Sequence, residues 1–259
     1  MVSQPDCDGG VQSAGAGYHA VRFWPAALIA ILLKSAPAKA AGLALVLAVD
    51  VSASVTADSY VLQRNGIARA FENARVVETI SAIPGGIETL VLEWSDPDKI
   101  MVTVPWQRVA DGRSASAFAA ALRATVRSSN GLTAIGPALL AAAAAFDRLP
   151  ELAEQRVIDI SGDGMANFGL PPAAARDRVL ADGISINGLV ILTEEPWLEG
   201  YYSSNVIGGS GAFVLAAQNF RSFADAMTRK LARELAGAGP AKAASGRPSL
   251  ALSSPHFSP

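Results

Sequence analysis

The chain has 259 residues, of which 51% are hydrophobic and 17% are charged, and its formal net charge at pH 7 is −2. This composition is that of a globular protein and excludes an intrinsically disordered one. Because the chain has no excess of basic residues, nucleic acid is not expected as a partner. A chain of this length buries one large core or two small ones.

The first 40 residues have the pattern of an export signal. Arg22 precedes an apolar stretch, residues 23–33, that is too short to span a bilayer. Small residues follow it and offer cleavage sites after Ala38 or Ala40. An uncleaved anchor or an ordinary core helix is the alternative. We expect residues 1–40 to be removed and the mature protein to be exported to the periplasm or the extracellular space, with no stable membrane span.

Removal of this leader restricts the chemistry that is left. Cys7, the only cysteine, and His19 lie in the leader, and His256, the other histidine, lies near the end of the chain. The folded body would then contain neither residue type, which excludes Ser-His-Asp and Cys-His nucleophiles and metal sites built from thiolate or imidazole. Any site must use oxygen ligands, Lys, Arg or the backbone.

Between residues 41 and 237, strand-like apolar runs alternate with segments of helical spacing. The expected strands cover residues 43–49, 87–94, 100–104, 157–160, 184–192 and 212–216. The expected helices cover residues 58–71, 114–126, 134–146, 173–181 and 220–235, and residues 74–83 extend or restart the first of them. The second and third strands flank a turn at residues 95–98, so this hairpin should place one antiparallel strand at the sheet edge.

This order predicts one doubly wound α/β domain over residues 41–237, with a mostly parallel sheet and helices on both faces. Residues 238–259 contain mainly Ala, Gly, Pro and Ser without periodicity, so we expect a disordered tail.

The first strand ends in Asp50-Val51-Ser52-Ala53-Ser54, which sets one carboxylate and two hydroxyls on alternate residues. In open parallel sheets, ligands bind at the carboxyl ends of the strands. A cluster of hard oxygens suits a hard divalent cation such as Mg²⁺. The alternative is that Ser54 or Thr56 only caps the helix that follows and that Asp50 has no chemical role.

Two later loops extend this pattern. Gly131-Leu132-Thr133 puts a hydroxyl just before a helix, and Ser161-Gly162-Asp163-Gly164 puts a carboxylate at the end of another buried strand. The ordered set, Asp-x-Ser-x-Ser, then a loop Thr, then a strand-end Asp, resembles the metal-ion-dependent adhesion site (MIDAS) of von Willebrand factor A (vWA) domains.

The similarity covers roughly residues 43–235 and includes several further motifs. With these, the chain resembles an uncharacterised group of exported bacterial proteins with A-like domains. The motifs are Glu93-Trp94-Ser95, Ile158-Asp159-Ile160-Ser161-Gly162-Asp163-Gly164, Ala175-Arg176-Asp177, Ile184-Ser185-Ile186-Asn187-Gly188-Leu189, Tyr201-Tyr202 and Gly208-Gly209-Ser210-Gly211-Ala212-Phe213.

The resemblance implies a role for each of the five oxygen-bearing residues. Ser52 and Ser54 would ligate the metal directly, and Thr133 would do so directly in a high-affinity state or through water otherwise. Asp50 and Asp163 would hold ordered waters on the ion. The ion would be Mg²⁺, with Mn²⁺ or Ca²⁺ as alternatives. Since few carboxylates would neutralise it, it should take a further ligand from outside, an Asp or Glu carboxylate of a protein partner.

Other residues have competing interpretations. Glu93 either supports the metal site or caps a neighbouring loop. Trp94, Trp106 and Trp197 either line a ligand surface or pack at the rim of the core. Asn167 either orients the metal loop or makes a turn. Asp159, inside an apolar strand, is expected to hydrogen-bond across the sheet or to mark an edge.

The sequence leaves three functions open. The first is an exported binding module that is not an enzyme, because no general base is evident. The second is a Mg²⁺-dependent hydrolase such as a phosphatase with Asp50 as nucleophile, although Ser52 stands where a second Asp is usual. The third is the same fold with an empty or purely structural site.

Overall fold

The computed structural model describes residues 40–193 and 195–238. These residues form a six-stranded sheet with strand order β3-β2-β1-β4-β5-β6. The strands are β1 (Ala41–Asp50), β2 (Ile87–Trp94), β3 (Ile100–Val109), β4 (Ala153–Gly162), β5 (Ser185–Ile191) and β6 (Val214–Ala217). The helices are α1 (Ala57–Glu72), α2 (Ala74–Ala82), α3 (Gly112–Arg123), α4 (Ile135–Ala145), α5 (Pro172–Ala181), α6 (Leu198–Asn205) and α7 (Phe223–Gly237).

Every described strand pairs in parallel with its neighbours except β3, which runs antiparallel to β2 at the edge of the sheet. The predicted fold class, a doubly wound α/β sheet with one antiparallel edge strand, is therefore confirmed. β1 lies inside the sheet between β2 and β4, so the order along the sheet changes direction there.

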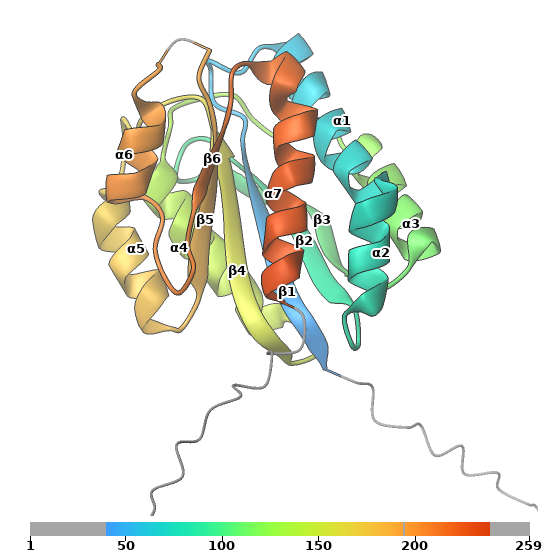
Figure 1. Cartoon of the computed structure of the whole chain (residues 1–259). Helices are drawn as coiled ribbons and strands as arrows, with labels where there is room; N and C mark the ends of the chain where they lie inside the picture. Colours follow the sequence, from blue (N-terminus) through green and yellow to red (C-terminus); the bar gives the residue numbers. More distant parts are fainter. Residues whose placement is uncertain (1–39, 194, 239–259) are drawn as a thin grey trace, which may run out of the picture. The chain divides into compact units, whose positions relative to one another are not determined.

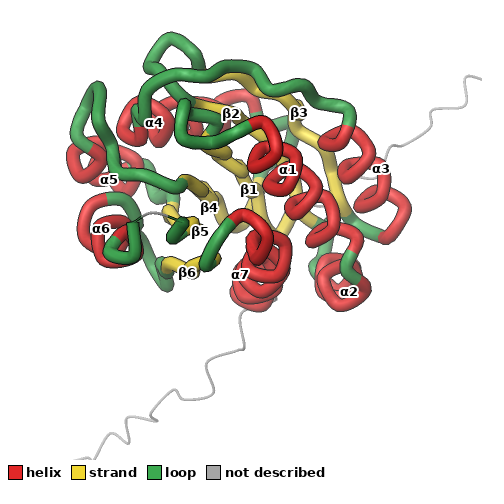
Figure 2. Tube along the Cα trace, turned by 90° about the horizontal axis from the view of Figure 1, so that it is seen from above, coloured by secondary structure: helices red, strands yellow, loops and turns green. Residues whose placement is uncertain are grey.

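The alternation of β1 divides the core into two layers. Leu43, Leu45 and Leu47 face one cluster of buried side chains, which α1, α2, α3 and α7 complete. Ala44 and Val46 face the other cluster, completed by α4, α5 and α6. Figures 1 and 2 show these two groups of helices on opposite faces of the sheet. A strand buried on both faces must be apolar at every position, which is why β1 reads as an unbroken apolar run.

Several elements differ in extent from the prediction, and one was missed. β3 continues through Pro105, which an edge strand tolerates because the missing N–H need not face a neighbour. β4 begins at Ala153, four residues earlier than predicted. Its first four residues are not buried and are mostly polar, so the apolar pattern did not reveal them. The missed helix, α6, has a sequence rich in Gly, Ser and Asn and buries only Leu198 and Tyr202, so it shows little helical pattern.

Helix α2 restarts rather than extends α1. The Asn73 side chain accepts hydrogen bonds from the backbone N–H groups of Arg75 and Val76, which makes Asn73 the N-cap of α2. All of the predicted leader (residues 1–40) except Ala40, and all of the predicted tail (residues 238–259) except Ala238, lie outside the described residues. In the described part of the chain, no helix is long and apolar enough to cross a membrane.

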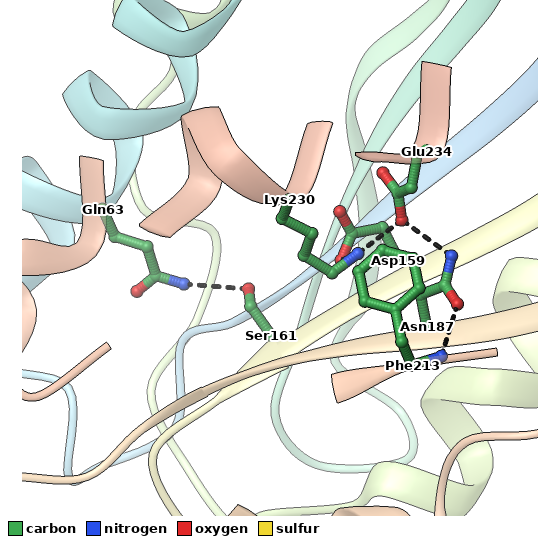
Figure 3. Close-up of polar contacts among 7 residues, drawn as sticks. All are labelled: Gln63, Asp159, Ser161, Asn187, Phe213, Lys230 and Glu234. Atoms are coloured by element: carbon green, nitrogen blue, oxygen red, sulfur yellow. Dashed lines mark hydrogen bonds and ion pairs between the residues drawn. The ribbon is translucent and has the colours of Figure 1, made fainter. Parts of the chain in front are cut away.

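A buried polar network joins α7 to the sheet (Figure 3). The Lys230 ammonium, on a side chain with no solvent exposure, lies 2.6 Å from a carboxylate oxygen of Asp159 and also contacts Glu234. Asn187, the neighbour of Asp159 on β5, donates to Glu234 at 2.9 Å and accepts from the Phe213 backbone at 3.1 Å. Among the residues that the structure describes, Asp159 thus neither hydrogen-bonds across the sheet nor marks an edge, since it pairs with a cation on α7 and β4 lies between β1 and β5.

This network holds two carboxylates against one ammonium in a region closed to water. Burial, and next the charge of Glu234, raise the pKa of Asp159, while Lys230 lowers it. Lys230 is therefore the group that makes an acidic residue tolerable in the middle of β4.

Replacement of Lys230 by Met should destabilise the protein strongly at pH 7. The substitution keeps the length of the side chain but leaves two buried carboxylates without their cation, which costs about 3–5 kcal/mol of unfolding free energy. Urea denaturation measures the change. Arg229→Met, an exposed neighbour on the same helix, is the control and should shift stability by about 0.5 kcal/mol or less. A loss below about 1 kcal/mol for Lys230→Met would contradict the assigned role of Lys230.

Candidate metal centre

The predicted oxygen cluster lies at the carboxyl ends of β1 and β4. Asp50 is the last residue of β1, and Asp163 directly follows β4. Val49 and Ser161 are paired across these parallel strands, so the two strands end at the same level. The change in strand order between β1 and β4 is where open α/β sheets form a ligand-binding crevice. Figure 2 views the sheet along its strands, from the end at which this cluster lies.

Four of the five predicted residues are joined by hydrogen bonds. The Ser52 backbone N–H donates to the Asp50 carboxylate at 2.8 Å. The hydroxyls of Ser52 and Ser54 are 3.3 Å apart, and the Ser54 hydroxyl donates to the Asp163 carboxylate at 2.6 Å. Ser54 therefore does not cap α1. Thr56 is the cap, since its hydroxyl accepts from the Ser59 N–H at 3.1 Å.

The fifth residue, Thr133, is brought beside the others by its backbone. The carbonyl of Gly131 accepts a hydrogen bond from the N–H of Ala53 at 2.8 Å, which ties the Thr133 loop to the loop after β1. Thr133 is buried. Among the described residues, no hydrogen bond joins its hydroxyl to Asp50, Ser52 or Ser54.

Asn167 fixes the Thr133 loop from the other side. Its side-chain oxygen accepts from the Thr133 N–H at 2.8 Å, and its own N–H donates to the Thr133 carbonyl at 3.1 Å. Of the two interpretations of Asn167, the orienting role is the correct one, because this residue links the loops that follow α3 and β4.

Glu93 supports the same region as a loop cap. Its carboxylate accepts from the Ser128 N–H and from the Tyr60 hydroxyl, each at 2.8 Å. Trp94 is fully buried, and Trp106 packs against Phe146, so both belong to the core. Trp197 is half exposed.

Neither the role of Arg127 nor the packing constraint at Gly131 was predicted from the sequence. The Arg127 guanidinium donates to the carbonyls of Val51 at 2.7 Å and Ser52 at 2.8 Å, and so fastens the backbone of the first loop. At Gly131, a Cβ atom would lie only 2.2 Å from the Asp96 carboxylate, so a side chain has no room there. A lone Arg beside a polar loop gave no signal, since a solvated arginine has the same appearance in a sequence.

The electrostatics of the cluster favour a cation. Burial, and next the charge of Asp163, raise the pKa of Asp50 to about 7, although the N–H and hydroxyl of Ser52 lower it. The second carboxylate oxygen of Asp50 is buried and has no hydrogen-bond partner among the described residues. Such an orphaned acceptor beside another carboxylate fits a divalent ion with its bound waters.

Tyr202 lies close to the same point. A Cβ built on Gly162 would be 2.5 Å from the Tyr202 hydroxyl and 2.9 Å from the unpartnered oxygen of Asp50, so only glycine fits between them. Burial and the charges of Asp50 and Asp163 raise the pKa of Tyr202. Its hydroxyl stays protonated at neutral pH and adds no charge.

The donor set is poor in charged ligands. Nowhere in residues 40–193 and 195–238 do three His, Cys, Asp or Glu side chains converge as a metal-binding group. An ion at this cluster would be held by the hydroxyls of Ser52, Ser54 and Thr133, and Asp50 and Asp163 would orient its waters. These residues fit the group that the sequence pattern implies. When bound, the ion would supply an electrophilic position for an anionic ligand.

With this strand order, the described residues have a fold similar to that of solved von Willebrand factor type A structures, as the sequence pattern indicated. A profile of the family described as "Protein of unknown function (DUF1194)" matches residues 40–239, and the chain belongs to that family. No curated protein matches the sequence.

Solved structures share the fold at low identity. One is proximal thread matrix protein 1 (PTMP1) from the mussel byssus with a zinc-occupied MIDAS motif (16% identity, TM-score 0.53, 77% of this chain and 49% of that one). Another is the pilus adhesin SpaC from Lactobacillus rhamnosus GG (13%, 0.54, 76% and 30%). A third is a von Willebrand factor type A protein from Catenulispora acidiphila (18%, 0.50, 74% and 42%). The chain spans less than half the length of each.

Replacement of Asp50 by Asn should stabilise the protein in EDTA at pH 8. Because folding raises the pKa of Asp50 from 3.8 to about 7, its contribution to stability is present below about pH 4 and is lost as the pH rises through 7. Asn keeps the acceptor for the Ser52 N–H and removes the charge. We expect a gain on the order of 2–4 kcal/mol at pH 8 that vanishes near pH 4.

Denaturation at several pH values measures this difference. Asp182→Asn, at an exposed position after α5, is the control and should show no such pH dependence. If Asp50→Asn were less stable than the natural protein in EDTA at pH 8, the buried charge would not be under strain.

Proposed function

We propose that this protein is an exported binding module that holds Mg²⁺ at the Asp50, Ser52, Ser54, Thr133 and Asp163 cluster and uses the ion to bind an acidic side chain of a protein partner. The observation that carries the proposal is the hydrogen-bonded chain from Asp50 to Asp163, which joins two strand ends and includes a buried carboxylate oxygen without a partner. Mn²⁺ and Ca²⁺ are the alternative ions.

The cluster is open on one side, as a docking site requires. Asp50 and Ser52 are buried, whereas Ser54 is exposed and its bond to Asp163 lies at the surface. The cavities of about 940 and 840 Å³ in the structure are lined by other residues. A surface site suits a side chain presented by a macromolecule better than it suits an enclosed small molecule.

The charge balance supports binding of an anion. The proposed direct ligands are the hydroxyls of Ser52, Ser54 and Thr133. Because hydroxyls are neutral, they leave most of the positive charge of a divalent ion uncompensated. The ion therefore attracts a carboxylate strongly, and Asp or Glu side chains are the carboxylates that proteins offer. The zinc-occupied MIDAS of PTMP1 and the adhesin SpaC are consistent with such a role for the shared fold.

Hydrolysis fits the residues less well. Residues 41–237 contain no His or Cys. Asp50, the nucleophile that a phosphatase would need, has no solvent exposure, and one of its oxygens accepts the Ser52 N–H. We therefore propose a protein that binds and is not an enzyme. Export follows from the expected signal in residues 1–40, which also makes the periplasm or the extracellular space its place of action.

The double substitution Ser52→Ala plus Ser54→Ala should weaken Mg²⁺ binding by at least about tenfold, which corresponds to about 1.4 kcal/mol. Isothermal titration of the purified protein with MgCl₂ measures the affinity. The matched control is Thr79→Ala plus Ser81→Ala, which removes two hydroxyls that donate only to carbonyls of α2. Equal affinities for all three proteins would refute the proposed ligand set.

A further inference from the structure

Exposed apolar side chains gather on the loops that surround the candidate metal centre. Large hydrophobic residues with substantial exposure include Leu132 (42%), Met165 (45%), Phe168 (54%) and Trp197 (50%). We call these four residues the apolar rim. They come from three separate loops, which follow α3, β4 and β5, and each of these loops reaches the end of the sheet at which Asp50 lies.

Hydrogen bonds fix two members of the apolar rim beside the candidate metal ligands. Leu132 immediately precedes Thr133, and its N–H donates to the Asp96 carboxylate at 2.8 Å. Phe168 immediately follows Asn167, which exchanges two hydrogen bonds with the Thr133 backbone. These two apolar side chains therefore flank the Thr133 loop.

Tyr201 connects the segments that carry the other two members, Met165 and Trp197. Met165 lies two residues after Asp163, and the N–H of the next residue, Ala166, donates to the Tyr201 hydroxyl at 3.2 Å. Tyr201 contacts Trp197 edge-on, with ring centroids 6.3 Å apart. Tyr201 also contacts Tyr202, the residue whose hydroxyl lies close to Asp50. The loop after β5 is thus connected to the loop that carries Asp163.

Long stretches of two of these loops carry no charged side chain. No Asp, Glu, Lys or Arg occurs between Ser128 and Phe146 or between Gly164 and Ala175. Charged side chains outside the cluster include Asp96 beside Leu132, whose carboxylate is paired with Lys99 at 2.6 Å, and Glu195 in the loop after β5. A partner segment that fits would place one negative charge at the centre and apolar side chains around it, because exposed apolar surface gains free energy only when other apolar groups cover it.

We propose that the apolar rim is part of the docking surface and that its occupant is a protein segment in which one Asp or Glu is flanked by large apolar or aromatic residues. This inference rests on the proposed function and narrows the class of partner. A segment with many acidic residues is not favoured, since its additional carboxylates would have to lie against Leu132, Met165 and Phe168, and the nearby Lys99 is already paired with Asp96. Aromatic and Met side chains are also the ones enriched at the centres of protein interfaces.

Three immobilised peptides test the proposal. Each has the same length, and they carry Asp between Phe and Leu residues, Asp between Ser residues, and Asn between Phe and Leu residues. Binding of the full-length protein is measured by biolayer interferometry in Mg²⁺ and in EDTA. We expect the apolar-flanked Asp peptide to bind at least about tenfold more tightly than the Ser-flanked one, in Mg²⁺ only. The Asn peptide should bind no better than the Ser-flanked peptide.

The double variant Phe168→Ser plus Trp197→Ser should keep its Mg²⁺ affinity in calorimetry and lose the preference between the two Asp peptides. The control is Met101→Ser plus Val102→Ser, which removes two equally exposed apolar residues on the edge strand β3. This control should retain the preference.

The failures of the two proposals are distinguishable. Equal Mg²⁺-dependent binding of both Asp peptides would overturn the role of the apolar rim and leave the proposed function standing. Equal binding of the Asp and Asn peptides, or binding that persists in EDTA, would mean simple hydrophobic adhesion and would overturn the inference. If no peptide bound in a Mg²⁺-dependent way, the proposed function would fall and the inference with it.

Discussion

Two carboxylates, those of Asp50 and Asp163, lie at the ends of neighbouring parallel strands, and no cationic side chain within residues 40–193 and 195–238 forms an ion pair with Asp50. The nearby Arg127 uses its guanidinium on the backbone carbonyls of Val51 and Ser52. A different solution is found further along β4, where the buried Asp159 has Lys230 as its cation. The charge of Asp159 is thus neutralised within the fold, whereas the charge of Asp50 is not. Under our proposal, a bound cation would stabilise the Asp50 carboxylate.

Contacts between loops fix the position of the Thr133 loop beside Asp50 and Asp163. Glu93 caps the start of the Thr133 loop, Asn167 holds its end, and Gly131 lets it approach Asp96 closely. Because these contacts come from β2, β4 and the connection after α3, the position of each hydroxyl depends on the sheet order rather than on local sequence. The proposed ligands are dispersed over three loops and come together only because β1 and β4 are neighbours.

Much of this arrangement could be predicted from the sequence, and the reasons are local. The apolar run before Asp50 and the Asp-x-Ser-x-Ser spacing predicted both the central strand and the cluster at its end. Asn167 and Arg127 could not be assigned, since their roles depend on contacts between residues more than thirty positions apart. Helix α6 was missed because it buries only two side chains. Lys230 and Asp159 lie 71 positions apart by their residue numbers, and only the packing of α7 on β4 brings them together.

We propose that hydroxyls from two loops and carboxylates at two strand ends surround one divalent ion. The most direct measurement is the anomalous difference density of crystals soaked in Mn²⁺, which replaces Mg²⁺ and scatters anomalously. We expect a single strong peak enclosed by Ser52, Ser54, Thr133 and Asp163, with Asp50 next to its water ligands. Well-ordered loops with no peak between these side chains, or a peak only at another place on the protein, would contradict this proposal.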